Sequence, residues 1–390
     1  MKRILFLAPF FALLSFIAVK KFNTTKSFQV VQQHMENRLK NYHDTLKFPR
    51  SVKAGALHSV PSQDWTSGFY PGILWYMFEY TKDKKWEQAA RTWTASMEKE
   101  KFNTRTHDLG FMLYCPYGNG LRLTNDQKYK EVLLQGARSL SKRYNAKAGV
   151  IKSWDHGKWQ FPVIIDNMMN LELLFWATKV SGDSSFYKIA VTHANTTLKN
   201  HFRADNSSYH VVDYDTLTGK VLSRVTHQGA ADESAWARGQ AWGMYGYTVT
   251  YRETKDKRFL DQAVKIADFF LSHPNLPKDK IPYWDFNAPK IPNEERDASA
   301  AAILASGLLE LSDYVKDGKK YNSAAEQILA SLSSDAYLAK PGTNHDFILM
   351  HCTGHKPAKS EIDVPLIYGD YYYIEALLRY RNKFETKVKS

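Results

Sequence analysis

The chain alternates between amphipathic helical stretches and short polar turns. Five turns look alike, and each separates two apolar stretches: TKDKKW (81–86), TNDQKY (124–129), SGDSSF (181–186), TKDKRF (254–259) and DGKKY (317–321). Their Asp, Gly and Asn residues are suited to end one helix and cap the next. The aromatic residue that closes each turn begins the apolar face of the second helix, which continues at a spacing of three to four. Each turn therefore predicts a helical hairpin.

Further helical segments open the series in FQVVQQHMENRLKNYHDTL (28–46) and close it in DYYYIEALLRYRNKF (370–384). The total of about six hairpins could stack into a solenoid or close into a ring. The repeats are unequal and their long loops lie at one end, which favours the ring. We therefore predict an all-α fold, an (α/α)6 barrel or toroid with its cleft at the loop end. The alternating stretch 209–229 contains a Thr-Gly turn and predicts a small inserted β-hairpin.

The N-terminal residues 1–22 have the pattern of a signal peptide. Lys2 and Arg3 precede an apolar run from Ile4 to Val19, which is short for a membrane span. We expect an exported, periplasmic protein with no membrane span after signal removal, and an uncleaved anchor is the alternative. Because no Pro-, Ser- or Gly-rich linker interrupts the rest, residues 23–390 are predicted to form a single (α/α)6-barrel domain.

Charge and composition narrow the choice of partner. The net charge of +13 favours a polyanionic partner, although scattered solvating lysines would explain it equally well. We expect no nucleic-acid partner, because no zinc spacing, phosphate loop or RNA-binding aromatic signature is present. No His/Cys cluster has metal-ligand spacing, so no metal is expected. Cys115 and Cys352 could pair or remain separate thiols.

Two aspartates are candidates for acid–base chemistry. Asp108 immediately precedes an apolar helical stretch, and Asp166 stands within an apolar stretch beside Asn167. Partial desolvation raises the pKa of a carboxyl group toward the range of a general acid, although each residue could also be a simple helix N-cap. The two lie about one repeat apart, so successive inner helices would bring them to one mouth. Two carboxylates there would suit a glycosidase.

The aromatic run DESAWARGQAWGMYGY (232–247) raises a separate question, because it contains Arg238 and Gln240. An unpaired buried charge is costly, so a polar partner is expected. On a helix, Arg238 and Trp242 share a face and would present a cation and an aromatic plane to an acidic sugar. Each tryptophan could alternatively be a core residue.

Further candidate sugar-binding residues lie in the loops. His210 and Gln228 flank the predicted β-hairpin, Trp65 lies in DWTSGFYPGILW (64–75), and Trp154 lies in SWDHGKWQFP (153–162). Together with Trp242, these aromatic residues at loop ends favour a sugar cleft.

The chain resembles the unsaturated glucuronyl hydrolases, glycoside hydrolase family 88. The pieces that carry the resemblance are DWTSGFYPG, THDLGF, IIDNMMNLELLFWA, WARGQAWGMYGY and DVPLIYGDYYYIEALLR, and they span the chain beyond the predicted signal. The resemblance implies an (α/α)6 barrel without a metal or organic cofactor. It also implies substrates that polysaccharide lyases leave behind, namely oligosaccharides with a 4,5-unsaturated uronic acid at the non-reducing end.

The resemblance also assigns roles to individual residues. Asp166 would be the general acid/base, and Asp108 would be the second catalytic aspartate, which holds sugar hydroxyls and supports the charge on the site. The implied substrate-binding residues are His107, Trp65, Trp154, His210, Gln228, Arg238 and Trp242. Related unsaturated rhamnogalacturonyl hydrolases, which act on pectin, are an alternative, and so is a non-catalytic toroid that binds acidic sugars.

One loop departs from the pattern of the family. Members that act on sulfated glycosaminoglycans can carry serines and a lysine in the loop that corresponds to HCTGHKPAKSEIDVP (351–365). Here His351 and Gly354 stand at the serine positions, while Lys356 remains. Lys356 is therefore a candidate contact for a sulfate or for the next sugar, with a solvated lysine as the alternative.

Overall fold

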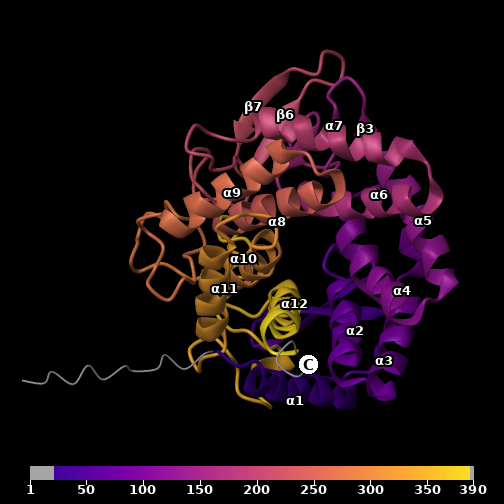
Figure 1. The fold of residues 1–390 in the computed structure, drawn as a ribbon, viewed down its shortest axis with the longest axis vertical. Helices are drawn as coiled ribbons and strands as arrows, with labels where there is room; N and C mark the ends of the chain where they lie inside the picture. The colour runs from indigo at the N-terminus through magenta and orange to yellow at the C-terminus, as the bar shows by residue number, and fades with distance from the viewer. Residues whose placement is uncertain (1–21, 387–390) are drawn as a thin grey trace, which may run out of the picture.

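The computed structural model describes residues 22–386, so all but the last residue of the predicted signal peptide lies outside the described part of the chain. Within that part, helical hairpins follow one another around a ring in chain order (Figure 1). The helices are α1 (Thr25–Asn41), α2 (Phe69–Thr81), α3 (Lys84–Ala95), α4 (Asn119–Thr124), α5 (Gln127–Ser141), α6 (Asn167–Ser181), α7 (Ser184–Asn200), α8 (Ala237–Thr254), α9 (Lys257–Ser272), α10 (Ala298–Leu311), α11 (Gly318–Leu332) and α12 (Ile367–Phe384).

The helices form an inner and an outer layer, as an (α/α)6 barrel requires. The inner layer consists of α2, the π-helix η2 (Gly110–Gly118) with α4, then α6, α8, α10 and α12. Each inner segment contacts the next, and α12 returns to α2, which closes the ring. The outer helices α3, α5, α7, α9 and α11 each pack on the inner segment before them. Helix α1 completes the outer layer, with Ser27 bonded to Ser333 and Glu36 paired with Lys85.

The turns between paired helices have the predicted capping chemistry. Four inner segments end on a left-handed residue and four outer helices begin with an aspartate whose side chain accepts a backbone N–H two residues further on. The left-handed residues are Lys82, Asn125, Gly182 and Lys255, and the aspartates are Asp83, Asp126, Asp183 and Asp256. The fifth turn differs, because Asp317 precedes α11 without a side-chain cap bond. The predicted leading aromatic residues are all buried: Trp86, Tyr129, Phe186, Phe259 and Tyr321.

This connectivity determines where the loops lie. Because each outer helix returns the chain after a turn, all inner segments run in the same direction. Their N-terminal ends therefore share one mouth of the barrel, and the segments leading into η2, α6 and α8 meet there. Asp108, Asp166 and Arg238 stand at these three starts.

Small β-sheets cover the loop end. Strands β6 (Val211–Tyr214) and β7 (Val221–Val225) form the predicted hairpin, and β5 (Pro162–Ile164) adds a third antiparallel strand that was not predicted. A second hairpin, β1 (Lys47–Lys53) with β2 (Ala56–Pro61), was also not predicted. Its turn residues Ala54 and Gly55 both have positive φ. Because the first of them is Ala, the turn lacks the usual Asn-Gly or Asp-Gly signal. A short pair, β3 (Tyr144–Asn145) and β4 (Val150–Ile151), completes the set.

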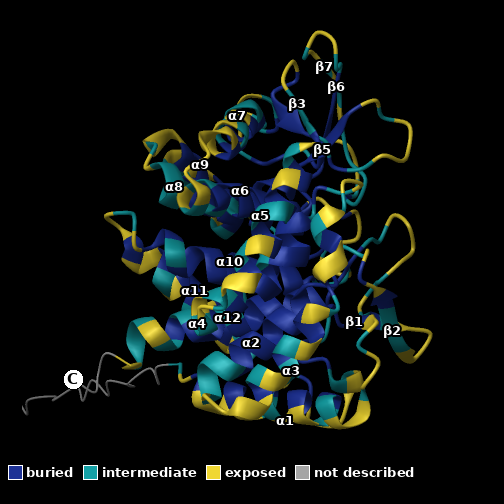
Figure 2. Ribbon diagram, turned by 90° about the vertical axis from the view of Figure 1, so that its right-hand side faces the viewer, coloured by how far each residue is buried: buried dark blue, intermediate teal, exposed yellow. Residues whose placement is uncertain are grey.

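The hydrophobic core lies where the inner helices meet the outer ones. In Figure 2 the inner helices α2, α10 and α12 are almost wholly buried, whereas α1, α3 and α11 alternate between buried and exposed residues. None of the described helices is both long and apolar enough to cross a membrane. Cys115 and Cys352 are separate buried thiols.

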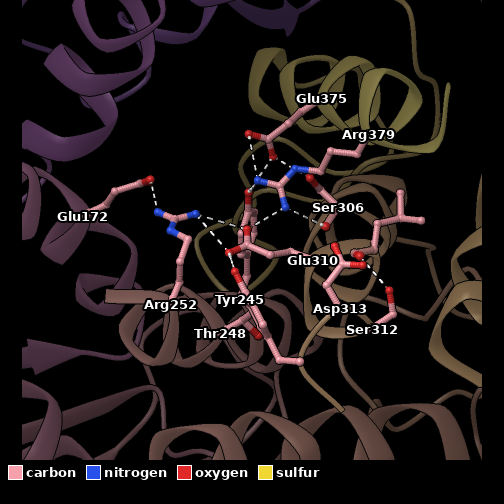
Figure 3. Close-up of polar contacts among 12 residues, drawn as sticks. Glu172, Tyr245, Thr248, Arg252, Ser306, Glu310, Ser312, Asp313, Glu375 and Arg379 are labelled. Carbon is pink, nitrogen blue, oxygen red and sulfur yellow. Dashed lines mark hydrogen bonds and ion pairs between the residues drawn. The ribbon is translucent and has the colours of Figure 1, made fainter. Parts of the chain in front are cut away.

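A polar network ties four inner helices together (Figure 3). Arg252 on α8 pairs with Glu172 on α6 and with Glu310 on α10, the latter at 3.0 Å. Arg379 on α12 donates to the same Glu310 at 2.7 Å and also to the hydroxyl of Tyr245 on α8. The turn end of the barrel is therefore held by shared ion pairs as well as by apolar packing.

Candidate active site

A cavity of about 410 Å³ opens at the loop end of the barrel. Most of the residues that the sequence indicated line it: Trp65, His107, Asp108, Trp154, Asp166, Gln228 and Arg238. The structure therefore brings together side chains that lie far apart in the sequence, and it does so through the common direction of the inner helices.

Asp166 is buried at the start of α6, and its exposed fraction is 8%. It occupies the N-cap position but makes no capping hydrogen bond with its side chain, so the simple capping interpretation is wrong. Its Oδ1 atom has no hydrogen-bond partner. Burial raises the pKa of this carboxyl to about 7; Arg238 opposes the rise and the charge of Asp108 adds to it. The group can therefore both donate and accept a proton near neutral pH.

His210 faces Asp166 from the β-sheet. Its Nε2 lies 4.0 Å from Oδ1 of Asp166, and its Nδ1 accepts the backbone N–H groups of His227 and Gln228, both at 3.1 Å. Burial lowers the pKa of His210 well below its usual value, so the ring is neutral. Because Nδ1 accepts hydrogen bonds, the proton of the neutral ring is on Nε2. This N–H points toward Asp166 without adding a positive charge.

Asp108 is held from two sides. Its Oδ2 accepts a hydrogen bond from Thr106 Oγ1 at 2.6 Å, and its Oδ1 lies 3.3 Å from Nε2 of His107. Burial lowers the pKa of His107, so that this histidine is neutral as well. The side chain of Asp108 is 15% exposed, against 11% for the side chain of Asp166. The site thus contains two carboxyl groups with different contacts, since Asp108 has two side-chain partners whereas Oδ1 of Asp166 has no hydrogen-bond partner.

Arg238 has the polar partner that the sequence demanded. Its guanidinium donates to Asp297 at 2.6 Å and to the carbonyl oxygens of Thr353 and Gly354 at 2.5 and 2.6 Å. Gln240 bonds to the backbone of Ser208. Arg238 therefore lines the cavity while it anchors the loop 351–365 to the start of α10, where Asp297 is the N-cap.

Three predicted binding residues are absent from the lining of the cavity, namely Trp242, Lys356 and His210, the last of which faces Asp166. Trp242 is fully buried, with its ring packed against Phe111 and Tyr372 at centroid distances of 5.0 and 5.3 Å. The predicted surface shared by Arg238 and Trp242 is wrong, because a helix this deep in the barrel directs Trp242 into the core. Lys356 pairs with Glu294 and Glu295, so its charge is already neutralised.

Sequence reasoning missed a charged group at the edge of the cavity. Arg50 on β1 binds Glu361 with two hydrogen bonds of 2.6 and 2.9 Å, and it binds Asp64 at 2.8 Å. These contacts connect the unpredicted hairpin to the loop 351–365. A signal was available for Asp64, which precedes Trp65 in a quoted motif, but nothing in the sequence marked Arg50.

The aromatic wall was also only partly foreseen. Trp154 stacks on His156 at 5.4 Å and packs against Trp159 and His227. His355 contacts the backbone carbonyl of His227 through Nε2 at 2.8 Å. Burial lowers the pKa of His227 to about 4, so this histidine is uncharged near neutral pH.

Phe111 closes the inner end of the cavity. It also lines a second cavity, of about 700 Å³, that extends from the turn end of the barrel. Its ring contacts Trp65, Phe69 and Trp242. One aromatic layer therefore divides the bore of the barrel into two compartments.

The fold and the site together indicate the class of protein: an (α/α)6 barrel with two acidic groups at its loop mouth, one with its pKa raised to about 7, is typical of a glycoside hydrolase. The chain belongs to Glycosyl Hydrolase Family 88, whose model matches residues 31–383. Among the described residues, no group of three or more His, Cys, Asp or Glu side chains could hold a metal ion. That no cofactor is needed stays a prediction.

Relatives of known name agree with this assignment. The chain is 53% identical to an unsaturated glucuronyl hydrolase of Formosa agariphila over 340 residues, which cover 86% of this chain and 85% of the relative. It is 35% identical to an unsaturated glucuronyl hydrolase of a Bacillus species, with 81% of this chain and 86% of the relative covered. The solved structure of an unsaturated glucuronyl hydrolase specific for heparin matches with a TM-score of 0.91 and 52% identity, over 94% of this chain and 98% of that one.

Proposed function

We propose that this enzyme removes the 4,5-unsaturated uronic acid from the non-reducing end of glycosaminoglycan oligosaccharides that lyases have produced. The observation that carries the proposal is Asp166, a buried carboxyl with a pKa of about 7 and a free oxygen at the cavity. Family membership and the named relatives support the same reaction.

The first step is protonation of the double bond. Protonated Asp166 transfers its proton to C4 of the C4–C5 double bond, which is a vinyl ether because C5 carries the ring oxygen. Positive charge then develops on C5 and the ring oxygen. The carboxylate of Asp108 stabilises this charge, since an opposite charge in a water-poor site acts strongly. Neutral His210 and His107 add no repulsion to the developing cation.

The second step adds water. The carboxylate of Asp166, now ionised, takes a proton from water as the oxygen bonds to C5, and this transfer restores the acid. The product is a hemiketal at C5. It opens to a ketone, and the hemiacetal left at C1 then releases the neighbouring sugar. One water is consumed, and the glycosidic bond breaks without direct attack at C1.

The proposed reaction predicts a loss of ultraviolet absorbance, because hydration removes the conjugated double bond. The enzyme should be tested with lyase-generated unsaturated disaccharides of chondroitin, heparin, hyaluronan and pectin. We expect loss on one or more of the glycosaminoglycan products, with a heparin product the first choice because of the match to the heparin-specific enzyme.

The other outcomes are equally informative. Loss on the pectin product alone would contradict the proposal in favour of an unsaturated rhamnogalacturonyl hydrolase. If the folded protein consumes none of the four, calorimetric titration with the same sugars would reveal a binding protein without activity.

We also propose that the enzyme works in the periplasm. The support is the sequence pattern of Lys2 and Arg3 followed by the apolar run from Ile4 to Val19. Cell fractionation, with N-terminal sequencing of the recovered protein, tests this location. A protein found in the cytosol with an intact N-terminus would contradict it.

A further inference from the structure

The cavity contains three arginines, and two of them are already neutralised. Arg50 is bonded to Glu361 and Asp64, and Arg238 is bonded to Asp297. A guanidinium that shares its donors with carboxylates has little charge left to offer to an anionic ligand. The third arginine, Arg105, stands three residues before Asp108.

Arg105 differs from the other two in its surroundings. Its side chain is exposed, and within the part of the chain that the structure describes it makes no hydrogen bond, ion pair or ring contact. It is the one arginine or lysine in the described lining of the cavity without a carboxylate partner. All five of its N–H donors are therefore free for a ligand.

The backbone that carries Arg105 is held in place on both sides. Arg143, only 5% exposed, donates to the carbonyl oxygen of Thr104 and pairs with Asp155 at 2.9 Å. The N–H of Arg105 itself donates to the side chain of Asn103 at 2.9 Å. The guanidinium is thus presented at the mouth from a fixed segment, which reduces the entropy lost when it binds a ligand.

Lys356 is the competing candidate, and its contacts argue against it. Its Nζ lies between Glu294 and Glu295, and it lies 5.3 Å over the ring of Trp284. A sulfate would have to displace two carboxylates to bind there. The exposed, unpaired Arg105 needs no such displacement.

The position of Arg105 indicates which part of a substrate it meets. If Asp166 protonates C4, the unsaturated ring and its C5 carboxylate must lie deep in the cavity, beside the buried acid. The leaving sugar then points toward the exposed mouth, where Arg105 stands. A planar guanidinium fits two oxygens of a sulfate with parallel hydrogen bonds.

We propose that Arg105 is a specificity-determining residue that binds a sulfate on the sugar next to the unsaturated uronic acid. This inference rests on the proposed function. It implies that the preference of this enzyme for sulfated products comes from the segment before Asp108 rather than from the loop that contains Lys356.

The test compares two unsaturated disaccharides that differ only in a sulfate on the second sugar. We expect Arg105→Ala to raise the KM ratio of sulfated to unsulfated substrate about ten-fold relative to the wild type, the effect of losing one exposed charge-assisted contact. Arg105→Lys should raise this KM ratio less than Arg105→Ala does. Lysine keeps the positive charge, but it cannot form two parallel hydrogen bonds to a sulfate. Lys158→Ala is the matched control, because Lys158 is exposed on a neighbouring loop and does not line the cavity.

Each remaining outcome has a defined meaning. An unchanged ratio in Arg105→Ala, or an equal change in Lys158→Ala, would overturn the proposal, the latter by showing a general effect of charge. A change in the ratio for Lys356→Ala alone would assign the sulfate to that lysine instead. If the wild type consumes neither disaccharide, the proposed function has failed, but the role of Arg105 has not been tested by activity. Binding of the sulfated disaccharide to the wild type and to Arg105→Ala then decides whether the contact exists.

Discussion

Transfer of a proton to carbon near neutral pH needs an acid that is neither fully ionised nor permanently protonated. Burial provides such an acid in Asp166, whose pKa is raised to about 7. The folded state is less stable when Asp166 is ionised, because the buried carboxylate has no hydrogen bond to its Oδ1. Chemistry and stability therefore make opposite demands on this one side chain.

Replacing Asp166 with Asn should abolish turnover, with a loss of at least about a hundred-fold, because the acid and base are both removed. Stability should respond in the opposite sense. The pKa of Asp166 is higher in the folded state, so its favourable contribution is complete below its unfolded pKa and is lost as the pH rises through about 7. We expect the Tm of Asp166→Asn to equal or exceed that of the wild type at pH 8. Thermal unfolding at pH 8, with circular dichroism of both proteins, checks this result, and a strongly lowered Tm would contradict it.

The pH dependence of activity tests the coupling of the two aspartates. Wild-type activity should fall above about pH 7, where Asp166 loses its proton. The charge of Asp108 raises the pKa of Asp166, so Asp108→Asn should move this decline to lower pH in the residual activity. The measurement is the pH profile of kcat/KM for both enzymes on one disaccharide. A decline that stays in place would show that the carboxylates do not interact.

At the scale of residues, the sequence was sufficient to predict the main charged residues of the cavity but not the residues that bind them. Asp108, Asp166 and Arg238 stood out because charged side chains in apolar or aromatic stretches need an explanation. Asp297, which neutralises Arg238, could not be found, since it is distant in sequence and typical of a helix cap. Trp242 was misplaced because the depth of a side chain within a barrel depends on neighbouring helices.

At the scale of elements, two adjacent residues have distinct roles in four of the hairpin turns. A left-handed residue ends the inner helix, and the next residue, an aspartate, caps the outer one, as at Lys255 and Asp256. The polar turns could be predicted from sequence because this chemistry is local. The β1–β2 hairpin could not, since its turn is Ala-Gly and β1 also bridges to Leu366, which is distant in sequence.

The capping role predicts a difference between two aspartates in equivalent turns. Asp256→Ala should destabilise the protein by about 1 kcal/mol, because it removes the hydrogen bond to the N–H of Arg258. Asp317→Ala is the control and should cost clearly less, since Asp317 makes no side-chain cap bond. Urea unfolding of the two variants measures the difference. Equal losses would mean that the cap bond is not the source of stability.

At the scale of the whole molecule, the two ends of the barrel serve different purposes. The loop end holds the buried acid and the open cavity, whereas the turn end is held by the network around Glu310. Burial alone would raise the pKa of Glu310, but Arg379 and Arg252 hold it below its usual value. Its stabilising contribution is therefore present above the unfolded pKa and is lost as the pH falls.

Glu310→Gln should accordingly destabilise the enzyme by roughly 2 to 3 kcal/mol at pH 7, because it leaves two arginines without their shared partner. This is below the range for fully buried pairs, since both arginines are 26% exposed. Glu98→Gln is the control, and it should change little because the pair of Glu98 with Lys101 lies on the surface. Urea unfolding measures both, and equal effects would show that the network does not hold the barrel.

The layer formed by Phe111 makes the substrate cavity a blind well rather than a tunnel. A long polysaccharide cannot thread through it, so cuts within a chain are geometrically excluded and only a terminal sugar reaches the acid. Both products must leave by the route through which the substrate entered. The enzyme therefore acts distributively: it releases the shortened sugar after every turnover and does not move along a chain.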